Sequence, residues 1–338
     1  MVAISKVLES NLLASSALPS GLVAVFAGAT AGIGEMALKS FAQHTTRPKI
    51  YYIGRSQEAG DRLQRELKDL NPEGTYQFVK KDMSLLKNVD DVCRDIKSKE
   101  KAINVLFMSQ GTLRLGVDTA EGLPLITALG FYSRQRLTAN LLPLLQQASS
   151  IRRVVTVMAG TKEGPIFADD ISGRKVPLLS ARGHLCTALT LSLDALARKA
   201  PDVSFIHNFP GSVNTNLIRR GDGMILQTLR LVTKAFVSVL GESVASKECG
   251  ERHAWLCLSG RYPPKETVEG LQGVTSETVA LGADGKRGSG VYSLDWDGES
   301  ASETVVQLLN KYQAEGMVDK VWGHVEGEFK RITGTTSI

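Results

Sequence analysis

Glycines are concentrated in one short segment near the start of the chain, and their spacing suits the binding of a phosphate group. The segment reads Ala27-Gly28-Ala29-Thr30-Ala31-Gly32-Ile33-Gly34 and lies between an apolar run, Leu22–Phe26, and a helical pattern through Phe41. Glycines allow unusual dihedral angles and bring backbone amides close to a pyrophosphate, and a helix start adds free N–H groups. The segment therefore predicts a dinucleotide site, with a purely structural turn as the alternative. The cofactor-binding residues expected here are Gly28, Thr30, Gly32, Ile33 and Gly34.

The end of the next apolar run, Lys49–Ile53, indicates which dinucleotide is bound. A site that prefers NAD places Asp or Glu here to hold the ribose 2′-hydroxyl, whereas this chain has Arg55 followed by Ser56. A guanidinium binds a 2′-phosphate with two hydrogen bonds. Arg55 and Ser56 therefore favour NADP over NAD. A solvated surface arginine is the alternative.

Two further residues follow predicted strands at positions where a nucleotide would lie. Asp82 could accept a hydrogen bond from the adenine amino group, or it could cap the following helix. Gly111 would let the backbone approach the adenosine ribose, or it could be an ordinary turn glycine.

The elements that must position these residues alternate between strand and helix. Apolar runs read as strands, and helical patterns at about 123–147 and 180–199 follow the fourth and fifth runs. Such alternation predicts an α/β fold, a doubly wound parallel sheet of the Rossmann type, whose ligands bind beyond the carboxyl ends of the strands. The predicted strands are Leu22–Phe26, Lys49–Ile53, Tyr76–Val79, Val105–Met108, Val154–Met158 and Val203–His207.

Composition excludes several classes of protein. The chain has 338 residues, 43% of them hydrophobic and 22% charged, which is not the composition of a disordered or collagen-like protein. The net charge of +5 comes without a long basic run, so we expect no nucleic-acid partner. The four cysteines and five histidines show no metal-ligand spacing, so we expect no metal and reduced thiols in a cytoplasmic protein.

The length suggests one enlarged domain, residues 21–338, after a helical lead-in at 1–20. The lead-in carries a cation and an acid inside its apolar stretch, unlike a secretory signal. We expect a lid at 216–245, whose apolar part, Met224–Leu240, contains Arg230 and Lys234 and is short for a membrane span. Membrane contact is therefore the less favoured reading. Residues 285–338 should form a C-terminal extension packed on the same core.

In this order, the motifs resemble the short-chain dehydrogenase/reductase family across about Leu22–Thr215. The glycine segment matches its first motif, Met108–Gly111 matches its Asn-Asn-Ala-Gly motif, and Pro210–Thr215 matches Pro-Gly-x-x-x-Thr. The resemblance implies that Pro210, Gly211 and Thr215 flank a nicotinamide. Residues Leu137–Leu145, Phe205–Gly211 and Gly290–Gly298 look more narrowly like a fungal branch found among secondary-metabolite oxidoreductases.

The chain departs from the family at the catalytic positions. The family uses Asn, Ser, Tyr and Lys, with Tyr as proton donor and Lys lowering its pKa. Here the Asn position falls near Gly130, the Ser position at Ala159 or Gly160, the Tyr position at Val176 and the Lys position at Ser180. No tyrosine lies between Tyr132 and Tyr262, so a shifted alignment does not restore the Tyr. All four catalytic roles are therefore expected to be vacant.

His184 and Ser180, one helical turn apart, are the candidate substitutes, because a histidine titrates near neutrality. The favoured alternative makes His184 a packed helix residue and Ser180 a helix N-cap. Tyr132 and Arg182 are weaker candidates.

Three functions remain open at this stage. The first is an NADP-dependent oxidoreductase acting on a ketone or alcohol of a small metabolite. The second is a non-redox isomerase, cyclase or dehydratase on the same fold, and the third is a catalytically silent nucleotide-binding module. A homodimer is possible through a leucine stripe, Leu137, Leu141, Leu142 and Leu145, and the run Leu185–Leu196, unless these residues are core.

Overall fold

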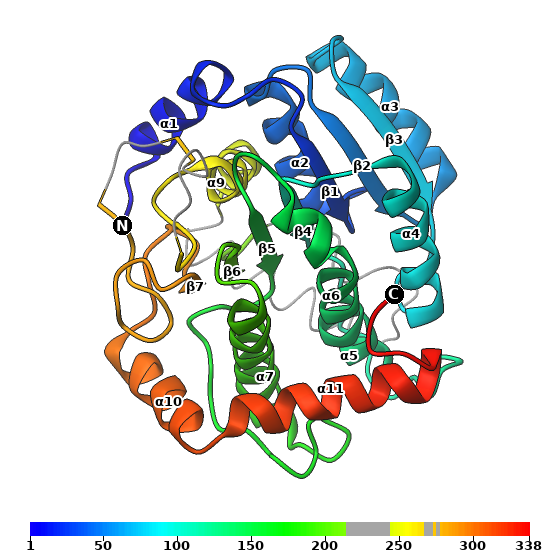
Figure 1. The fold of residues 1–338 in the computed structure, drawn as a ribbon, viewed down its shortest axis with the longest axis vertical. Helices are drawn as coiled ribbons and strands as arrows, with labels where there is room; N and C mark the ends of the chain where they lie inside the picture. Colours follow the sequence, from blue (N-terminus) through cyan, green and yellow to red (C-terminus); the bar gives the residue numbers. More distant parts are fainter. Residues whose placement is uncertain (214–243, 267–272, 275–277) are drawn as a thin grey trace, which may run out of the picture.

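The computed structural model describes residues 1–213, 244–266, 273–274 and 278–338, which surround one parallel sheet (Figure 1). Its strand order is β3-β2-β1-β4-β5-β6-β7, and every neighbouring pair is parallel. The order reverses between β1 and β4, so the fold is the doubly wound α/β sheet that the alternation predicted. The strands are β1 Val23–Ala27, β2 Lys49–Gly54, β3 Thr75–Lys80, β4 Val105–Met108, β5 Arg153–Val157, β6 Ser204–Asn208 and β7 Val291–Leu294.

Helices cover both faces of the sheet, and each face has its own hydrophobic core. Both faces are buried because crossovers between parallel strands place helices on either side. One core includes residues of α1 Ile4–Ala17, α2 Gly32–His44, α3 Gln57–Leu70 and α9 Ser246–Leu258. The other includes residues of α4 Leu86–Lys99, α6 Ser133–Gln146, α7 Leu178–Lys199, α10 Glu303–Ala314 and α11 Met317–Thr333.

The sheet gains a strand that the sequence did not reveal. The last strand that the sequence predicted is Val203–His207, but β7 comes from the C-terminal extension and pairs with β6 from Phe205↔Val291 onward. β7 has only four residues and no alternation of polar and apolar side chains, so its pattern alone does not mark a strand. The hydrogen bonds offered by β6 define it.

One predicted helix needed correction, and another helix was missed. The helix expected at about 123–147 is interrupted: α5 Leu125–Thr127 leads into a π-helical turn, η1 Ala128–Tyr132, before α6 begins. α9 was not foreseen, because polar residues interrupt its apolar pattern. One of these, Glu251, is buried by hydrogen bonds with His44 and Asn11, which fasten α9 to α2 and α1.

The leucine stripe belongs to the core. Leu137, Leu141, Leu142 and Leu145 are buried at 0%, 0%, 7% and 0% exposure within the chain itself. In Figure 1, α11 runs along the lower edge of the molecule, and it contacts both α7 and α4. A homodimer therefore could not use this stripe, and pairing with a second copy stays a prediction.

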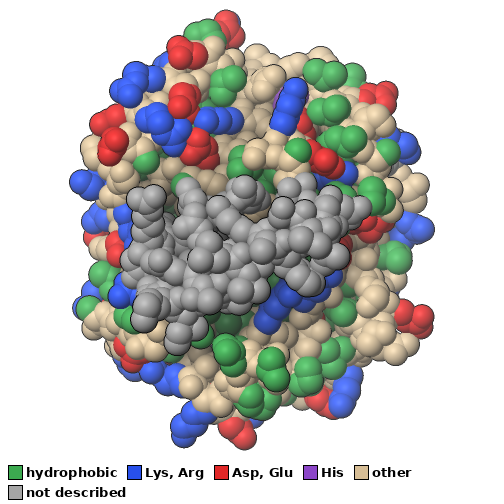
Figure 2. Space-filling model, turned by 180° about the vertical axis from the view of Figure 1, so that it is seen from behind, with side chains coloured by type: hydrophobic (Ala, Val, Ile, Leu, Met, Phe, Trp, Pro, Cys, Tyr) green, Lys and Arg blue, Asp and Glu red, His purple; other side chains and the backbone are tan. Residues whose placement is uncertain are grey.

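The expectations about a membrane span, a lid and a basic surface can be compared with the described residues. Within the described part of the chain, no helix is both long enough and apolar enough to cross a bilayer. The expected lid falls almost wholly on residues 214–243, outside the described ranges. On the described surface in Figure 2, Lys and Arg side chains are interspersed with Asp and Glu.

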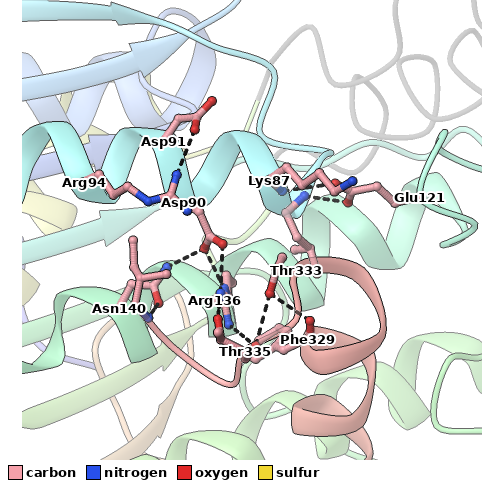
Figure 3. A network of polar contacts seen from close by, with 12 residues as sticks. Lys87, Asp90, Asp91, Arg94, Glu121, Arg136, Asn140, Phe329, Thr333 and Thr335 are labelled. Atoms are coloured by element: carbon pink, nitrogen blue, oxygen red, sulfur yellow. Dashed lines mark hydrogen bonds and ion pairs between the residues drawn. The ribbon is translucent and has the colours of Figure 1, made fainter.

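A buried ion pair holds the C-terminal segment against the sheet domain (Figure 3). Arg136 Nε donates to Asp90 Oδ1 at 2.7 Å and its Nη2 donates to Oδ2 at 2.9 Å, and the two side chains are 0% and 3% exposed. Arg136 Nη1 also donates to the Thr335 carbonyl at 2.9 Å. Asn140 donates to Asp90 and accepts the N–H of Ile338. The pair therefore joins α4 and α6 to the segment after α11.

Replacing Asp90 should strongly destabilise the protein, because Arg136 would remain buried without its counter-charge. We expect Asp90→Asn to lower the free energy of unfolding by about 3 kcal/mol in urea titrations. The matched control is the neighbouring Asp91→Asn, since Asp91 is 50% exposed and pairs with exposed Arg94. The control should cost less than about 1 kcal/mol. Equal losses for the two variants would show that the buried pair contributes nothing special.

Candidate active site

A cleft opens at the carboxyl edge of the sheet, where the strand order reverses. Its lining contains eight of the residues that the sequence assigned to the cofactor: Gly28, Thr30, Gly32, Ile33, Gly34, Arg55, Asp82 and Gly111. The sequence did not assign the other lining residues, which are Ala31, Ile53, Gly54, Lys81, Met83, Ser109, Gln110 and Leu129. The structure thus brings together predicted residues that follow β1, β2, β3 and β4.

Two glycines of the first loop are required by close contacts with the end of β4. Gly28 has φ +77°, and a Cβ there would lie 2.5 Å from the backbone nitrogen of Gln110. A Cβ on Gly34 would lie 2.4 Å from Ser109 Oγ. α2 begins at Gly32, so its unpaired N–H groups and positive dipole end lie at the cleft.

Two cations stand at one end of the cleft, after adjacent strands. Arg55 follows β2, is exposed, and forms no ion pair with any described residue. Lys81 follows β3 and contacts Asp91 at 3.2 Å. Sequence reasoning missed Lys81, although its position directly after a strand is the same signal that identified Arg55. Ser56 does not line the cleft; its hydroxyl caps α3 by accepting the Ala59 N–H at 3.2 Å.

Asp82 lines the cleft and is not a helix cap. Its Oδ1 accepts the N–H of Ser84 at 3.0 Å, and α4 begins only at Leu86. A carboxylate from a distant loop performs the capping: Glu121 accepts the N–H groups of Leu86 at 2.6 Å and Lys87 at 3.0 Å. The capping interpretation of Asp82 was therefore wrong.

The segment after β6 lies at the same edge of the sheet but outside the lining of the cleft. Gly211 has φ +76°, and a Cβ there would lie 2.9 Å from Trp296 Cβ. Pro210 precedes it, half-buried, directly beside Phe209, whose N–H donates to the Leu294 carbonyl at 2.8 Å. Thr215 lies outside the described residues.

His184 has no free ring nitrogen for catalysis. Nδ1 accepts the N–H of Phe167 at 3.1 Å, and Nε2 lies 3.2 Å from the Ile171 carbonyl. Burial lowers the pKa of the imidazole, which favours the neutral form that these two contacts require. The interpretation as a packed helix residue fits these contacts.

Ser180 is half-buried and is not an N-cap. α7 begins two residues earlier at Leu178, with Pro177 at the N-cap position, and the Ser180 N–H donates to the Pro177 carbonyl at 2.8 Å. The helix starts at the first residue after proline, whose fixed φ suits the entry to a helix.

The positions that the resemblance assigns to catalysis come from three separate segments of the chain. Gly130 lies in η1, Ala159 follows β5 by two residues, and Val176 precedes α7. Tyr132 turns toward the C-terminal helix, where its hydroxyl lies 2.7 Å from Nε2 of His324 on α11.

Arg182, one of the weaker catalytic candidates, lies together with Lys162 near Phe209. Arg182 Cζ is 5.2 Å and Lys162 Nζ is 5.0 Å from the centre of the Phe209 ring. Lys162 also pairs with Asp295 at 2.9 Å. The segment that the resemblance places beside a nicotinamide is therefore flanked by positive charge.

A buried acid cluster braces the turn after β5, and sequence reasoning missed it. Glu163 Oε1 accepts hydrogen bonds from Thr190 and Ser293, both at 2.7 Å, and lies 3.5 Å from His207 Nδ1. The Ala159 N–H donates to His207 Nε2 at 3.2 Å. Burial would raise the Glu163 pKa, but the hydrogen bonds from His207, Ser293 and Thr190 outweigh it and hold the pKa below its usual value. No spacing in the sequence could reveal residues that come from β6, β7 and α7.

A second missed residue, Arg134, lies behind the wall of the cleft. Its side chain bridges the ends of β4 and β5 by donating to the carbonyls of Gln110 at 2.6 Å and Val157 at 2.8 Å and to Thr156 Oγ1 at 2.6 Å. Burial lowers its pKa to about 9. Among the described residues, no three His, Cys, Asp or Glu side chains are placed to hold a metal ion.

Comparisons with known proteins agree with this fold. No protein-family model matches the chain. Oxidoreductase andH of Emericella variicolor is 34% identical and covers 99% of each chain, and short-chain dehydrogenase/reductase SAT2 of Stachybotrys chartarum is 26% identical over 91% of this chain and 92% of its own. The Pseudomonas aeruginosa RhlG/NADP complex has a TM-score of 0.52 at 16% identity, covering 72% of this chain and 91% of that one.

The chain belongs to the short-chain dehydrogenase/reductase family. Within the family, its full-length relatives include fungal oxidoreductases.

Adding a methyl group at Gly34 should disrupt the loop, because Ser109 Oγ and the Gly28 carbonyl lie 2.4 and 2.5 Å from its Cβ position. We expect Gly34→Ala to destabilise the protein by about 2 kcal/mol, measured by thermal unfolding. Gly111→Ala is the matched control, since the nearest atom to its Cβ position, on Arg134, is 3.9 Å away. Unfolding temperatures equal for both variants would contradict the close packing of the loop.

Glu163 should make stability depend on acidity. Because its folded pKa lies below the unfolded value, its stabilising effect is complete above about pH 4.5 and is lost as the pH falls through the folded pKa. We expect Glu163→Gln to lose about 2 kcal/mol at neutral pH, with a smaller loss relative to wild type under acid conditions. The control Glu73→Gln, on an exposed residue, should follow the wild-type profile. Parallel pH profiles for wild type and Glu163→Gln would refute this assignment.

Proposed function

We propose that the chain is an NADP(H)-dependent oxidoreductase acting on a ketone or alcohol carbon of a small metabolite, in secondary-metabolite biosynthesis. The carrying observation is the cleft itself, in which the glycine loop, the start of α2 and a cationic end formed by Arg55 and Lys81 line one continuous site. The relationship to fungal oxidoreductases supports the reaction class, and the RhlG/NADP complex shows that a similar fold binds this dinucleotide.

The cationic end distinguishes NADP from NAD. A 2′-phosphate at the end of β2 would meet the Arg55 guanidinium, which has no ion-pair partner among the described residues, with Lys81 beside it. No Asp or Glu follows β2 at Gly54-Arg55-Ser56 to hold a 2′-hydroxyl instead. The adenosine half of the cofactor therefore belongs over β2 and β3, and the nicotinamide half over β4 and β5.

Apolar side chains at the start of α7 favour an apolar substrate. Leu178 is 71% exposed and Leu179 is fully exposed, at the carboxyl edge of the sheet where the family carries its Tyr and Lys. Exposed leucines in adjacent positions are costly in water and are typical of a surface that binds apolar groups. A polycyclic or polyketide-like ketone would be apolar enough to bind at this surface.

The proton in this reaction must come from a source other than the family's tyrosine. NADPH would supply a hydride to the carbonyl carbon, and the carbonyl electron pair moves to oxygen, which then takes up a proton. Gly130, Ala159 and Val176 carry no acidic proton, and both nitrogens of His184 are engaged. We therefore propose solvent water as the donor, so the reaction proceeds without a tyrosine of lowered pKa.

Calorimetric titration with NADPH, followed by turnover with apolar ketones, tests the proposal. Binding together with oxidation of NADPH and formation of the alcohol is the expected result. Binding without any turnover would favour the silent module, and product formed equally without cofactor would favour the non-redox enzyme. No binding of NADPH would refute the proposed function.

Arg55 should set the preference between the two dinucleotides. We expect Arg55→Ala to weaken NADPH binding by roughly tenfold and to leave NADH binding unchanged, because only the 2′-phosphate loses a charge-assisted contact. The control is Arg65→Ala, on an exposed arginine of α3 outside the cleft. Equal weakening of NADPH and NADH would contradict the role of Arg55.

A further inference from the structure

Arg134 is a buried cation without a counter-ion among the described residues. It is 2% exposed, and its three hydrogen bonds all go to neutral acceptors. Its Nε finds no acceptor in the described ranges. Burial of an unpaired charge is costly, and several kcal/mol remain unrecovered unless other groups compensate.

No described carboxylate near Arg134 offsets this cost. Arg134 lies inside a continuous helical run, since α6 follows η1 with helical backbone at Tyr132 and Ser133. The buried carboxylate at the same edge, Glu163, is occupied by Thr190, Ser293 and His207 and does not pair with it. The charge of Arg134 is therefore not neutralised by the buried carboxylate at this edge.

The hydrogen bonds of Arg134 fix one peptide group of the cleft wall. Its Nη2 holds the Gln110 carbonyl at 2.6 Å, on the buried side of the wall. In a trans peptide the following N–H points the opposite way, so the N–H of Gly111 faces the cleft that Gly111 lines. This N–H has no acceptor among the described residues. The cation thus lies directly behind an N–H group that is free to bind a ligand.

The strand order separates this wall from the cationic end of the cleft. Arg134 bridges the ends of β4 and β5, on the opposite side of the β1–β4 reversal from Arg55 and Lys81. On the proposed function, this side holds the nicotinamide, so Gly111 would lie nearer to the nicotinamide half than to the adenosine ribose that the sequence suggested. The nicotinamide ring is positively charged in NADP⁺ and neutral in NADPH.

We propose that Arg134 is a positioning residue that makes the site select NADPH over NADP⁺. Its positive charge, together with the oriented Gly111 N–H, disfavours the charged ring of the oxidised cofactor and leaves the neutral ring unaffected. The site then takes the reduced cofactor from a mixed pool and releases the oxidised one, which directs the enzyme toward reduction of a ketone. This inference rests on the proposed function.

The test is the ratio of the dissociation constants of NADP⁺ and NADPH, measured by calorimetry on the full chain. Wild type should bind NADPH more tightly than NADP⁺, and this measurement tests the inference without any variant. Arg134→Gln should lower the ratio by about fivefold or more, and Arg134→Lys, which keeps the charge, should retain most of it. A role confined to packing would change both dissociation constants equally.

Arg153 provides the matched control. It is also 2% exposed, has an unpaired Nε and donates only to carbonyls, those of Leu256 at 2.7 Å and Ser259 at 3.0 Å. It begins β5, at the end of the strand away from the cleft. Arg153→Gln should therefore lower stability and leave the ratio unchanged.

Some results would contradict the inference alone, and another would also refute the proposed function. Wild type that binds NADP⁺ as tightly as NADPH would contradict it directly. The inference would also be contradicted if Arg134→Gln changed the ratio of dissociation constants by less than about twofold, or if Arg153→Gln changed this ratio as much as Arg134→Gln does. The proposed function would stand in either case. If wild type binds neither cofactor, the proposed function fails and the inference fails with it.

Discussion

The close approach of the first loop to the end of β4 is the contact on which the site depends. Gly28 and Gly34 allow backbone and side-chain atoms of Ser109 and Gln110 to approach within distances that no other residue type permits. The start of α2 and Gly111 both line the cleft at the reversal of strand order. The predicted cofactor residues from four strands meet because these two loops pack together.

The carboxyl edge of the sheet carries buried charge that the rest of the fold must satisfy. Glu163 is stabilised by hydroxyls and a histidine from α7, β6 and β7, whereas Arg134 has only neutral acceptors from β4 and β5. Buried polar groups of this kind hold the strand ends in one arrangement, because any displacement would leave them without partners. These buried hydrogen bonds therefore hold the ends of β4, β5, β6 and β7 together at the candidate active site.

The C-terminal extension belongs to the fold as much as the glycine loop does. It supplies β7, the Ser293 hydroxyl that Glu163 needs, and α11, which packs against α7 and α4. Arg136 and Asp90 join it to the first half of the chain. The leucine stripe of α6 is consequently buried within one copy of the chain, where the sequence had allowed either a core or a dimer interface.

The sequence by itself determined the alternation of strands and helices, the glycine loop, and the positions of Arg55, Asp82 and Gly111, because these are local patterns of spacing and residue type. It could not determine which distant groups meet. Only the tertiary structure showed that Glu121 caps α4, that both ring nitrogens of His184 are engaged, and that Arg134 lies behind Gly111 with no counter-ion among the described residues. These features depend on contacts between residues far apart in the chain, and local sequence patterns do not reveal such contacts.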